Sequence, residues 1–139
     1  MSKTQIQSAP LLRERAVGRA VVVELYGEID ILTAAPISAR LDVLTTAPQP
    51  ELVLDLRGVT FIDCRGLALL CRARTRALNQ GGRLRLVTSS PRILCLLRRT
   101  HLGQAFDVHP GLLEALSAVT DGGAPTRITD TEAFAVPLR

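Results

Sequence analysis

Apolar residues follow two alternating patterns along the chain. Short, largely apolar runs that are typical of strands occupy residues 11–16, 20–26, 52–56, 84–87 and 105–108. Between and after them, apolar residues recur every three or four positions, which is typical of helices that pack one face on a sheet. The alternation predicts an α/β fold with two layers: a central mixed, largely parallel β-sheet and about four helices.

Local start and stop signals mark the ends of these elements. The four expected helices begin near Thr33, Cys64, Pro91 and Pro110, and end near Ala47, Asn79, Thr100 and Val119. Thr33 and Ser90 are expected to cap the first and third helices, because short side chains with an oxygen favour that position. The segment 27–30 is expected to end the second strand.

The second helix is expected to have two faces. Leu67, Leu70, Cys71 and Leu78 share the face expected to be buried. The opposite, outward face carries Arg65, Leu69, Arg72 and Arg76. An outward Leu69 would permit a homodimer.

Length and composition are those of one globular domain. The chain has 139 residues, of which 47% are hydrophobic and 22% charged, so it can bury a core. We expect the domain to span residues 10–120, between a flexible N-terminal tail over 1–9 and a C-terminal tail over 121–139. No apolar run approaches the ~18 residues of a membrane helix and no signal segment follows Met1, so we expect no membrane partner and a cytoplasmic location.

Basic residues are unevenly distributed. The net charge is +4, yet no acidic residue lies between Asp63 and Asp107. The arginines in that stretch are Arg65, Arg72, Arg74, Arg76, Arg83, Arg85, Arg92, Arg98 and Arg99. Such a block indicates an acidic partner, a nucleic-acid surface or a solvated face. Aromatic residues, on which bases stack, make up 3% of the chain, so we expect no specific nucleic-acid partner.

Sequence signatures of catalysis are missing. The chain has no phosphate-binding glycine loop and no nucleophile elbow. Its cysteines, Cys64, Cys71 and Cys95, are not spaced as metal ligands and are expected to be reduced thiols. We therefore expect no metal, no cofactor and no enzymatic activity.

Two aspartates follow apolar runs and precede expected helices. Asp30 and Asp63 would lie at the carboxyl edge of a parallel sheet, where loops meet and sites gather. The segments 27–30 and 63–66 are therefore expected to lie side by side. A purely structural role, with Asp63 capping a helix and Asp30 supporting a turn, stays equally open.

Three segments resemble the STAS domain of bacterial anti-sigma factor antagonists. They are residues 25–36, which resemble the entry to the family's first helix, residues 54–67, which resemble its signature, and residues 90–102, which resemble its third helix. The resemblance implies a STAS-like fold and a partner that is an anti-sigma factor and serine kinase. It also implies that binding of this partner controls the availability of a sigma factor.

The resemblance implies where the partner binds. The expected binding residues in the switch loop and on the second helix are Glu28, Asp30, Asp63, Cys64, Arg65, Gly66, Leu69, Arg72 and Arg76. Relatives are phosphorylated on a serine in an Asp-Ser-Ser-Gly motif, and a phosphate adds about −1.5 to −2 charges that oppose docking. Here the motif is Asp63-Cys64-Arg65-Gly66, so Arg65 stands at the serine position and we expect no phosphoacceptor there.

Several alternatives stay open. The chain is an antagonist that phosphorylation does not switch off, or a diverged STAS scaffold or decoy in a signalling complex, or a nucleotide-binding STAS module. A signal other than phosphate, with Cys64 as its candidate residue, is a further alternative.

Overall fold

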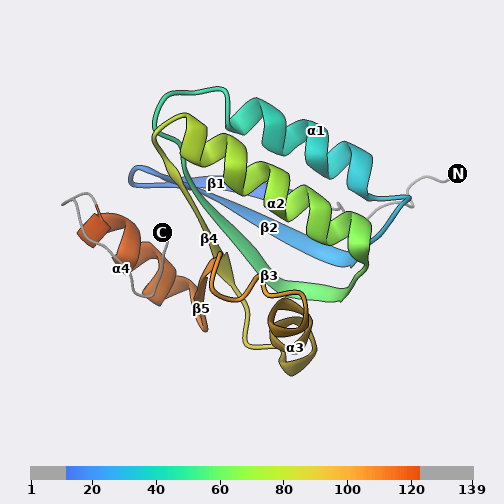
Figure 1. Ribbon diagram of the computed structural model, residues 1–139. Coiled ribbons are helices and arrows are strands. Elements are labelled where there is room, and N and C mark those ends of the chain that lie inside the picture. Colours follow the sequence, from blue (N-terminus) through green and yellow to red (C-terminus); the bar gives the residue numbers. More distant parts are fainter. Residues whose placement is uncertain (1–11, 123–139) are drawn as a thin grey trace, which may run out of the picture.

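Five strands and four helices form the computed structural model of the chain, which describes residues 12–122 (Figure 1). In chain order they are β1 Leu12–Val17, β2 Ala20–Ile29, α1 Ala34–Leu44, β3 Glu51–Ile62, α2 Cys64–Asn79, β4 Arg83–Val87, α3 Pro91–Arg99, β5 Asp107–His109 and α4 Leu112–Gly122. The expected tail over residues 1–9 lies outside the described residues. So does the expected C-terminal tail, except that α4 continues past residue 120.

The strands form one sheet in the order β1-β2-β3-β4-β5. β1 is antiparallel to β2, and every other neighbouring pair is parallel. Gly18 in the β1–β2 turn has φ 59°, a left-handed conformation that glycine adopts readily. The mixed, largely parallel sheet with an initial hairpin and four helices confirms the predicted fold class.

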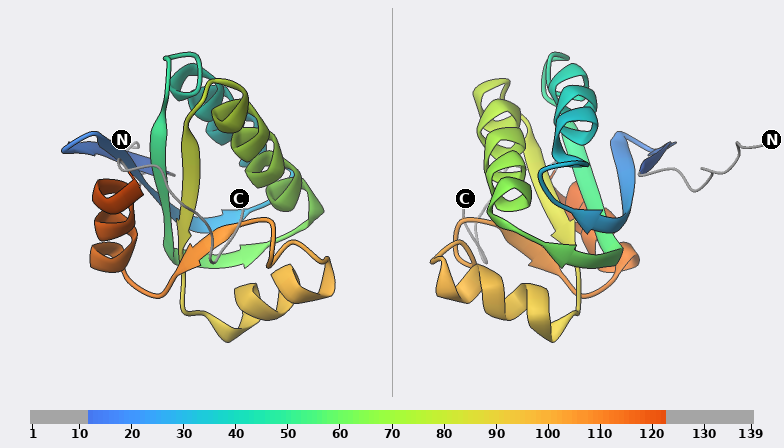
Figure 2. Two further views of the ribbon diagram at one scale, coloured as in Figure 1. Left: turned by 60° about the vertical axis from the view of Figure 1, so that its left-hand side comes forward. Right: turned by 90° about the vertical axis from the view of Figure 1, so that its right-hand side faces the viewer.

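Helices cover both faces of the sheet to different extents (Figure 2). α1 and α2 lie side by side on one face and enclose the larger core, in which Leu25, Leu54 and Leu70 are fully buried. α4 lies on the other face over a smaller apolar cluster that includes Val22 and Val53. The larger core thus has the expected two-layer arrangement, and α4 adds a further, smaller layer.

Two arginines, one in the β1–β2 turn and one on β4, bind the last turns of α4. Arg19 donates a hydrogen bond to the backbone oxygen of Val119 at 3.3 Å, and Arg85 donates one to that of Ala118 at 3.4 Å. Arg85 is buried and also pairs with Glu51 at 2.8 Å and with Asp107 at 3.2 Å. Cations at the carboxyl end of a helix satisfy its free carbonyls and its dipole.

Two strands are longer than the sequence predicts. β2 continues through the segment 27–30 as far as Ile29, and β3 continues from Leu56 to Ile62. The register shifts at Gly27, which has φ 78°, but pairing between β2 and β3 resumes beyond it. The strand does end within the segment 27–30, but the expectation that it stops at residue 26 was wrong, because Gly27 causes an irregularity in the pairing and not a break.

The predicted outward face of α2 is partly wrong. Leu69 is 5% exposed and belongs to the larger core, whereas Leu78, expected to be buried, is 41% exposed. α2 packs against α1 as well as against the sheet. The buried side of the helix is therefore rotated toward α1, which buries Leu69 and exposes Leu78. A homodimer through an outward Leu69 therefore loses its basis.

The last elements agree with prediction except at their ends. Ser90 caps α3 by accepting a hydrogen bond from the amide of Ile93, as expected. β5 begins at Asp107 and not at residue 105, since Phe106 is buried in the core and its amide bonds to Leu102. Among residues 12–122, no helix has the length and apolar character needed to cross a bilayer.

Candidate functional site

The turns after β2 and β3 are joined at one edge of the sheet. The amide of Asp63 donates a hydrogen bond to the backbone oxygen of Ile29 at 3.2 Å. The last residues of the two strands are also paired, Glu28 with Phe61 and Ile29 with Ile62. The prediction that the segments 27–30 and 63–66 lie side by side is therefore confirmed.

Gly66 allows the start of α2 to pack closely on these strand ends. A Cβ atom at this position would lie 2.6 Å from the Cγ2 atom of Ile62 and 2.8 Å from the backbone oxygen of Ile29. Both distances are too short for real contacts, and one of the obstructing atoms is backbone and cannot rotate away. The first turn of α2 therefore requires glycine here.

Both aspartates of this edge are bound to backbone amides. Asp63 Oδ1 accepts hydrogen bonds from the amides of Arg65 at 2.9 Å and Gly66 at 3.1 Å, which makes it the cap of α2. Asp30 Oδ1 accepts from the amides of Leu32 at 3.0 Å and Thr33 at 3.2 Å, which closes the turn before α1. The structural role of both residues is thus confirmed.

Thr33 precedes α1 but does not cap it with its side chain. Its hydroxyl donates to the backbone oxygen of Glu28 at 2.7 Å and accepts from the amide of Asp30 at 3.0 Å. The side chain therefore ties the turn back to the end of β2, which is a different role from the one that the sequence predicts.

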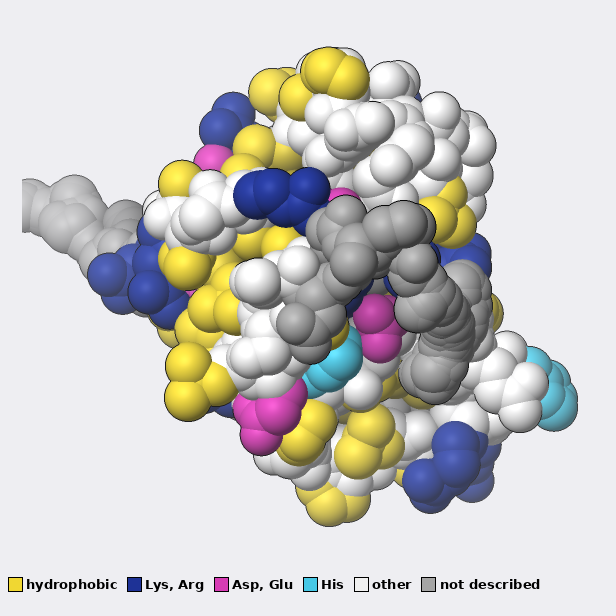
Figure 3. Space-filling model, turned by 90° about the vertical axis from the view of Figure 1, so that its left-hand side faces the viewer, with side chains coloured by type: hydrophobic (Ala, Val, Ile, Leu, Met, Phe, Trp, Pro, Cys, Tyr) yellow, Lys and Arg dark blue, Asp and Glu magenta, His cyan; other side chains and the backbone are white. Residues whose placement is uncertain are grey.

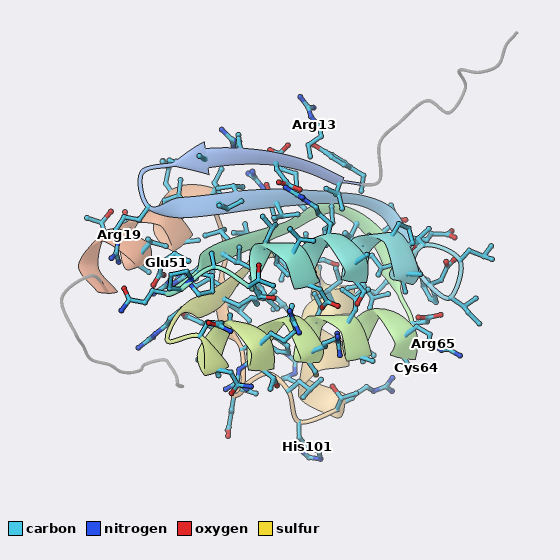
Figure 4. The ribbon with its side chains drawn as sticks, turned by 90° about the horizontal axis from the view of Figure 1, so that it is seen from above. Arg13, Arg19, Glu51, Cys64, Arg65 and His101 are labelled. Atoms are coloured by element: carbon cyan, nitrogen blue, oxygen red, sulfur yellow. The ribbon has the colours of Figure 1, made fainter. Side chains whose placement is uncertain are left out.

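Apolar side chains are exposed at this edge. Ile31 is 60% exposed, Leu32 84% and Phe61 47%. Cys64 and Arg65 are also exposed, at the first turn of α2, and Arg65 points away from the sheet (Figure 4). We call Ile31, Leu32, Phe61, Cys64 and Arg65 the exposed edge. Sequence reasoning missed its three apolar members; a signal was present in the hydrophobic pair 31–32 inside a turn.

Arg72 and Arg76 lie farther along α2 and link it to α1. Arg72 binds Asp42 through two hydrogen bonds of 3.0 and 2.9 Å. Arg76 donates to Thr45 Oγ1 at 2.9 Å and to the backbone oxygen of Asp42 at 3.0 Å. The hydrogen bond from Arg72 lowers the pKa of Asp42. Together with buried Leu69, these residues belong to the α1–α2 contact, apart from the exposed edge.

Arg65 differs from those two arginines, because it has no acidic partner among residues 12–122. Its charge is therefore available to another molecule. Glu28 is also exposed, near the end of β2.

The thiols and the other candidate ligands form no cluster. All three cysteines are free, Cys64 exposed and Cys71 and Cys95 partly buried, and burial raises the pKa of Cys71. Within the described part of the chain, no three His, Cys, Asp or Glu side chains stand close enough to hold a metal ion. What the edge offers chemically is a surface for binding: apolar contact area, one free cation and rigid turns.

Comparisons with known proteins point to one family. A family model described as "Mlab, STAS domain" matches residues 12–117. Anti-sigma-F factor antagonist RsfA of Mycobacterium tuberculosis is 32% identical over 102 residues, which cover 71% of this chain and 79% of that protein.

Solved structures agree. The crystal structure of an anti-sigma factor antagonist from Mycobacterium paratuberculosis is 28% identical, covers 79% of this chain and 93% of that one, and superposes with a TM-score of 0.73. The structure of the anti-sigma factor antagonist SpoIIAA in its unphosphorylated form is 21% identical, and the match covers 79% of this chain and 96% of that one. It superposes with a TM-score of 0.67, which shows a similar fold.

Proposed function

Because the chain belongs to the STAS domain family of bacterial anti-sigma factor antagonists, we propose that it binds an anti-sigma factor and so controls the availability of a sigma factor. Relatives whose names state this role match most of the described residues. The proposed role needs binding and no catalysis. It also places the chain in the cytoplasm, where sigma factors act.

The exposed edge is the proposed binding surface. One observation supports it most directly: three large apolar side chains and an unpaired arginine are exposed where β2 and β3 end and α2 begins, and a backbone hydrogen bond joins these segments. Apolar anchors beside a charged group are typical of the residues that dominate binding energy at protein interfaces. Rigid turns lose little conformational entropy when the partner binds.

Arg65 makes this binding insensitive to serine phosphorylation. It occupies the position that the family resemblance assigns to the phosphorylated serine, at the exposed first turn of α2. A guanidinium has no hydroxyl for a serine kinase to phosphorylate, and it keeps a positive charge where phosphate would bring a negative one. The partner is therefore expected to present carboxylates toward Arg65.

The test measures affinity for the anti-sigma factors of the chain's own organism. Each is purified and titrated with the chain by calorimetry, and release of its sigma factor is followed in the same mixture. We expect one of them to bind, and we expect Leu32→Asp to raise its Kd at least about tenfold, or ~1.4 kcal/mol.

Leu113→Asp is the matched control, because Leu113 is 79% exposed and lies on α4, away from the exposed edge. It should leave the Kd unchanged. Absence of binding to every anti-sigma factor would refute the proposed function. If Leu32→Asp and Leu113→Asp bound equally well, the exposed edge would not be the binding surface.

A further inference from the structure

A second surface, on α3, has features of a binding site that the proposed function does not use. A hollow of about 460 Å³ lies between α3 and the segment that leads to β5. Leu94, Leu97 and Val108 line it with apolar groups, and Arg98 and His101 add polar ones. We call it the α3 hollow. Its volume suits one or two inserted side chains.

The exposed charge on α3 is positive and unpaired, and one of its arginines, Arg98, lines the hollow. Arg92, Arg98 and Arg99 are exposed on α3, and none forms an ion pair with a residue in the described range. No acidic residue lies between Asp63 and Asp107. The helix dipole stabilises positive charge at the carboxyl end of α3, where Arg98 and Arg99 lie. Their side chains remain exposed and can bind a partner.

His101 occupies a backbone conformation that favours glycine. It has φ 61° and follows the C-cap Thr100. The amides of His101 and Leu102 bond to the backbone oxygens of Arg98 at 3.1 Å and Leu97 at 2.8 Å, which is the Schellman ending, normally made with glycine at this position. An imidazole is held here against local preference, at the hollow, with its side chain turned outward (Figure 4). Strain of this kind is typical of functional positions.

We infer that the α3 hollow binds an acidic, amphipathic segment of another protein. An apolar side chain of the segment enters between Leu94, Leu97 and Val108. The carboxylates of the segment form an ion pair with Arg98 and contact His101. Attraction between the unpaired arginines and the carboxylates favours both encounter and selectivity. No residue that lines the α3 hollow belongs to the exposed edge, so the inference can be tested independently of the anti-sigma factor.

A protein segment fits this surface better than a nucleic acid does. The floor of the hollow is apolar, whereas a phosphate backbone requires a row of cations. On the α4 side of the molecule, which faces the viewer in Figure 3, Lys and Arg side chains likewise form separate groups with apolar and acidic side chains between them.

The test uses a synthetic peptide with leucines at helical spacing flanked by glutamates, and a control peptide in which glutamine replaces each glutamate. Both are titrated into the isotope-labelled full chain while amide NMR signals are recorded. We expect the acidic peptide to shift the amides of Leu94, Arg98 and His101. We expect the glutamine peptide to bind at least tenfold more weakly.

Variants locate the effect. Arg98→Glu should raise the Kd of the acidic peptide at least tenfold, whereas Arg13→Glu, an exposed arginine on β1, should leave it unchanged. His101→Gly should raise the melting temperature and still weaken binding severalfold, which a merely structural residue would not do. The amide spectrum of each variant shows whether it is folded.

Other occupants give distinct results, and each would overturn the inference. Shifts of the same amides on deletion of residues 123–139 would mean that the chain's own segment lies in the α3 hollow. Concentration-dependent shifts without peptide would mean a second copy. Binding of duplex DNA that Arg98→Glu abolishes would mean a nucleic acid. Absence of shifts at α3 with the acidic peptide would mean that the hollow binds no such segment.

Discussion

Asp63 has two roles at the residue scale, because its carboxylate and its amide bind different elements. The carboxylate caps α2 through Arg65 and Gly66, and the amide holds the end of β2 through Ile29. The sequence predicts the cap, since an aspartate precedes a helical pattern. It also predicts that the two segments lie close together, though not the hydrogen bond itself.

Asp63→Ala is expected to destabilise the fold by about 1 kcal/mol, because two amides of the first turn of α2 lose their acceptor. Urea denaturation measures the loss. Asp63→Ser is the control, because its hydroxyl can accept the same hydrogen bonds and should restore most of the stability. Equal losses in both variants would show that the capping oxygen is not what matters.

Arg65→Ser is expected to create a phosphoacceptor at the exposed first turn of α2. Incubated with ATP and an anti-sigma factor that has serine kinase activity, the variant should incorporate phosphate detected by mass spectrometry, and binding should then weaken through the added negative charge. The unmodified chain should remain unlabelled. Labelling of the original chain at another residue would contradict the proposal that phosphorylation does not control it.

At the scale of elements, the contact between α1 and α2 decides which side chains are available. Leu69 fills this contact, and Arg72 and Arg76 bind Asp42 and Thr45 across it. A helical wheel separates apolar from polar positions, but it does not reveal that a helix has two packing partners. This is why the predicted outward face included a buried leucine and omitted exposed Leu78.

Leu69→Ala is expected to destabilise the fold by about 2–5 kcal/mol, since it removes a buried side chain from the larger core and leaves a cavity. Leu78→Ala, on the same helix but 41% exposed, should cost less than about 1 kcal/mol. Thermal and urea unfolding of both variants compare the two positions. Similar losses would contradict the observed orientation of α2.

At the scale of the whole molecule, the alternation of strands and helices was enough to predict the fold class, and the family resemblance was needed to predict the fold. Strand pairs that alternate with helices have few right-handed solutions, and the resemblance in residues 54–67 selected one of them. The exposed apolar residues of the edge were not predictable, because exposure depends on which turns the neighbouring elements leave uncovered. The same holds for the layer that α4 adds.

Asp55 on the central strand β3 is expected to make stability depend on pH. Its burial alone would raise its pKa, but the hydrogen bonds and charge of Arg57, at 2.7–3.1 Å, outweigh burial and lower it. A carboxyl whose pKa is lower in the folded state stabilises that state above its ordinary pKa of about 4, and the contribution is lost as pH falls.

Asp55→Asn should therefore lower the free energy of unfolding at about pH 7 by ~1 kcal/mol. The loss is small because the side chain of Arg57 is half exposed, and solvent weakens its ion pair with Asp55. Urea midpoints at about pH 7 and about pH 3 should differ less in the variant than in the original chain. An identical drop in both proteins would mean that Asp55 does not contribute to acid sensitivity.

The anchoring of α4 by Arg19 and Arg85 has a practical consequence. Arg19 lies in the turn before β2, so the end of α4 is fixed near the start of that strand, whereas the exposed edge lies where β2 ends. A fluorescent reporter attached at solvent-facing Thr120 would lie on a helix whose end is bound to the sheet, away from the exposed edge. Its anisotropy would rise when a large protein docks, without the dye touching the contact that is being measured.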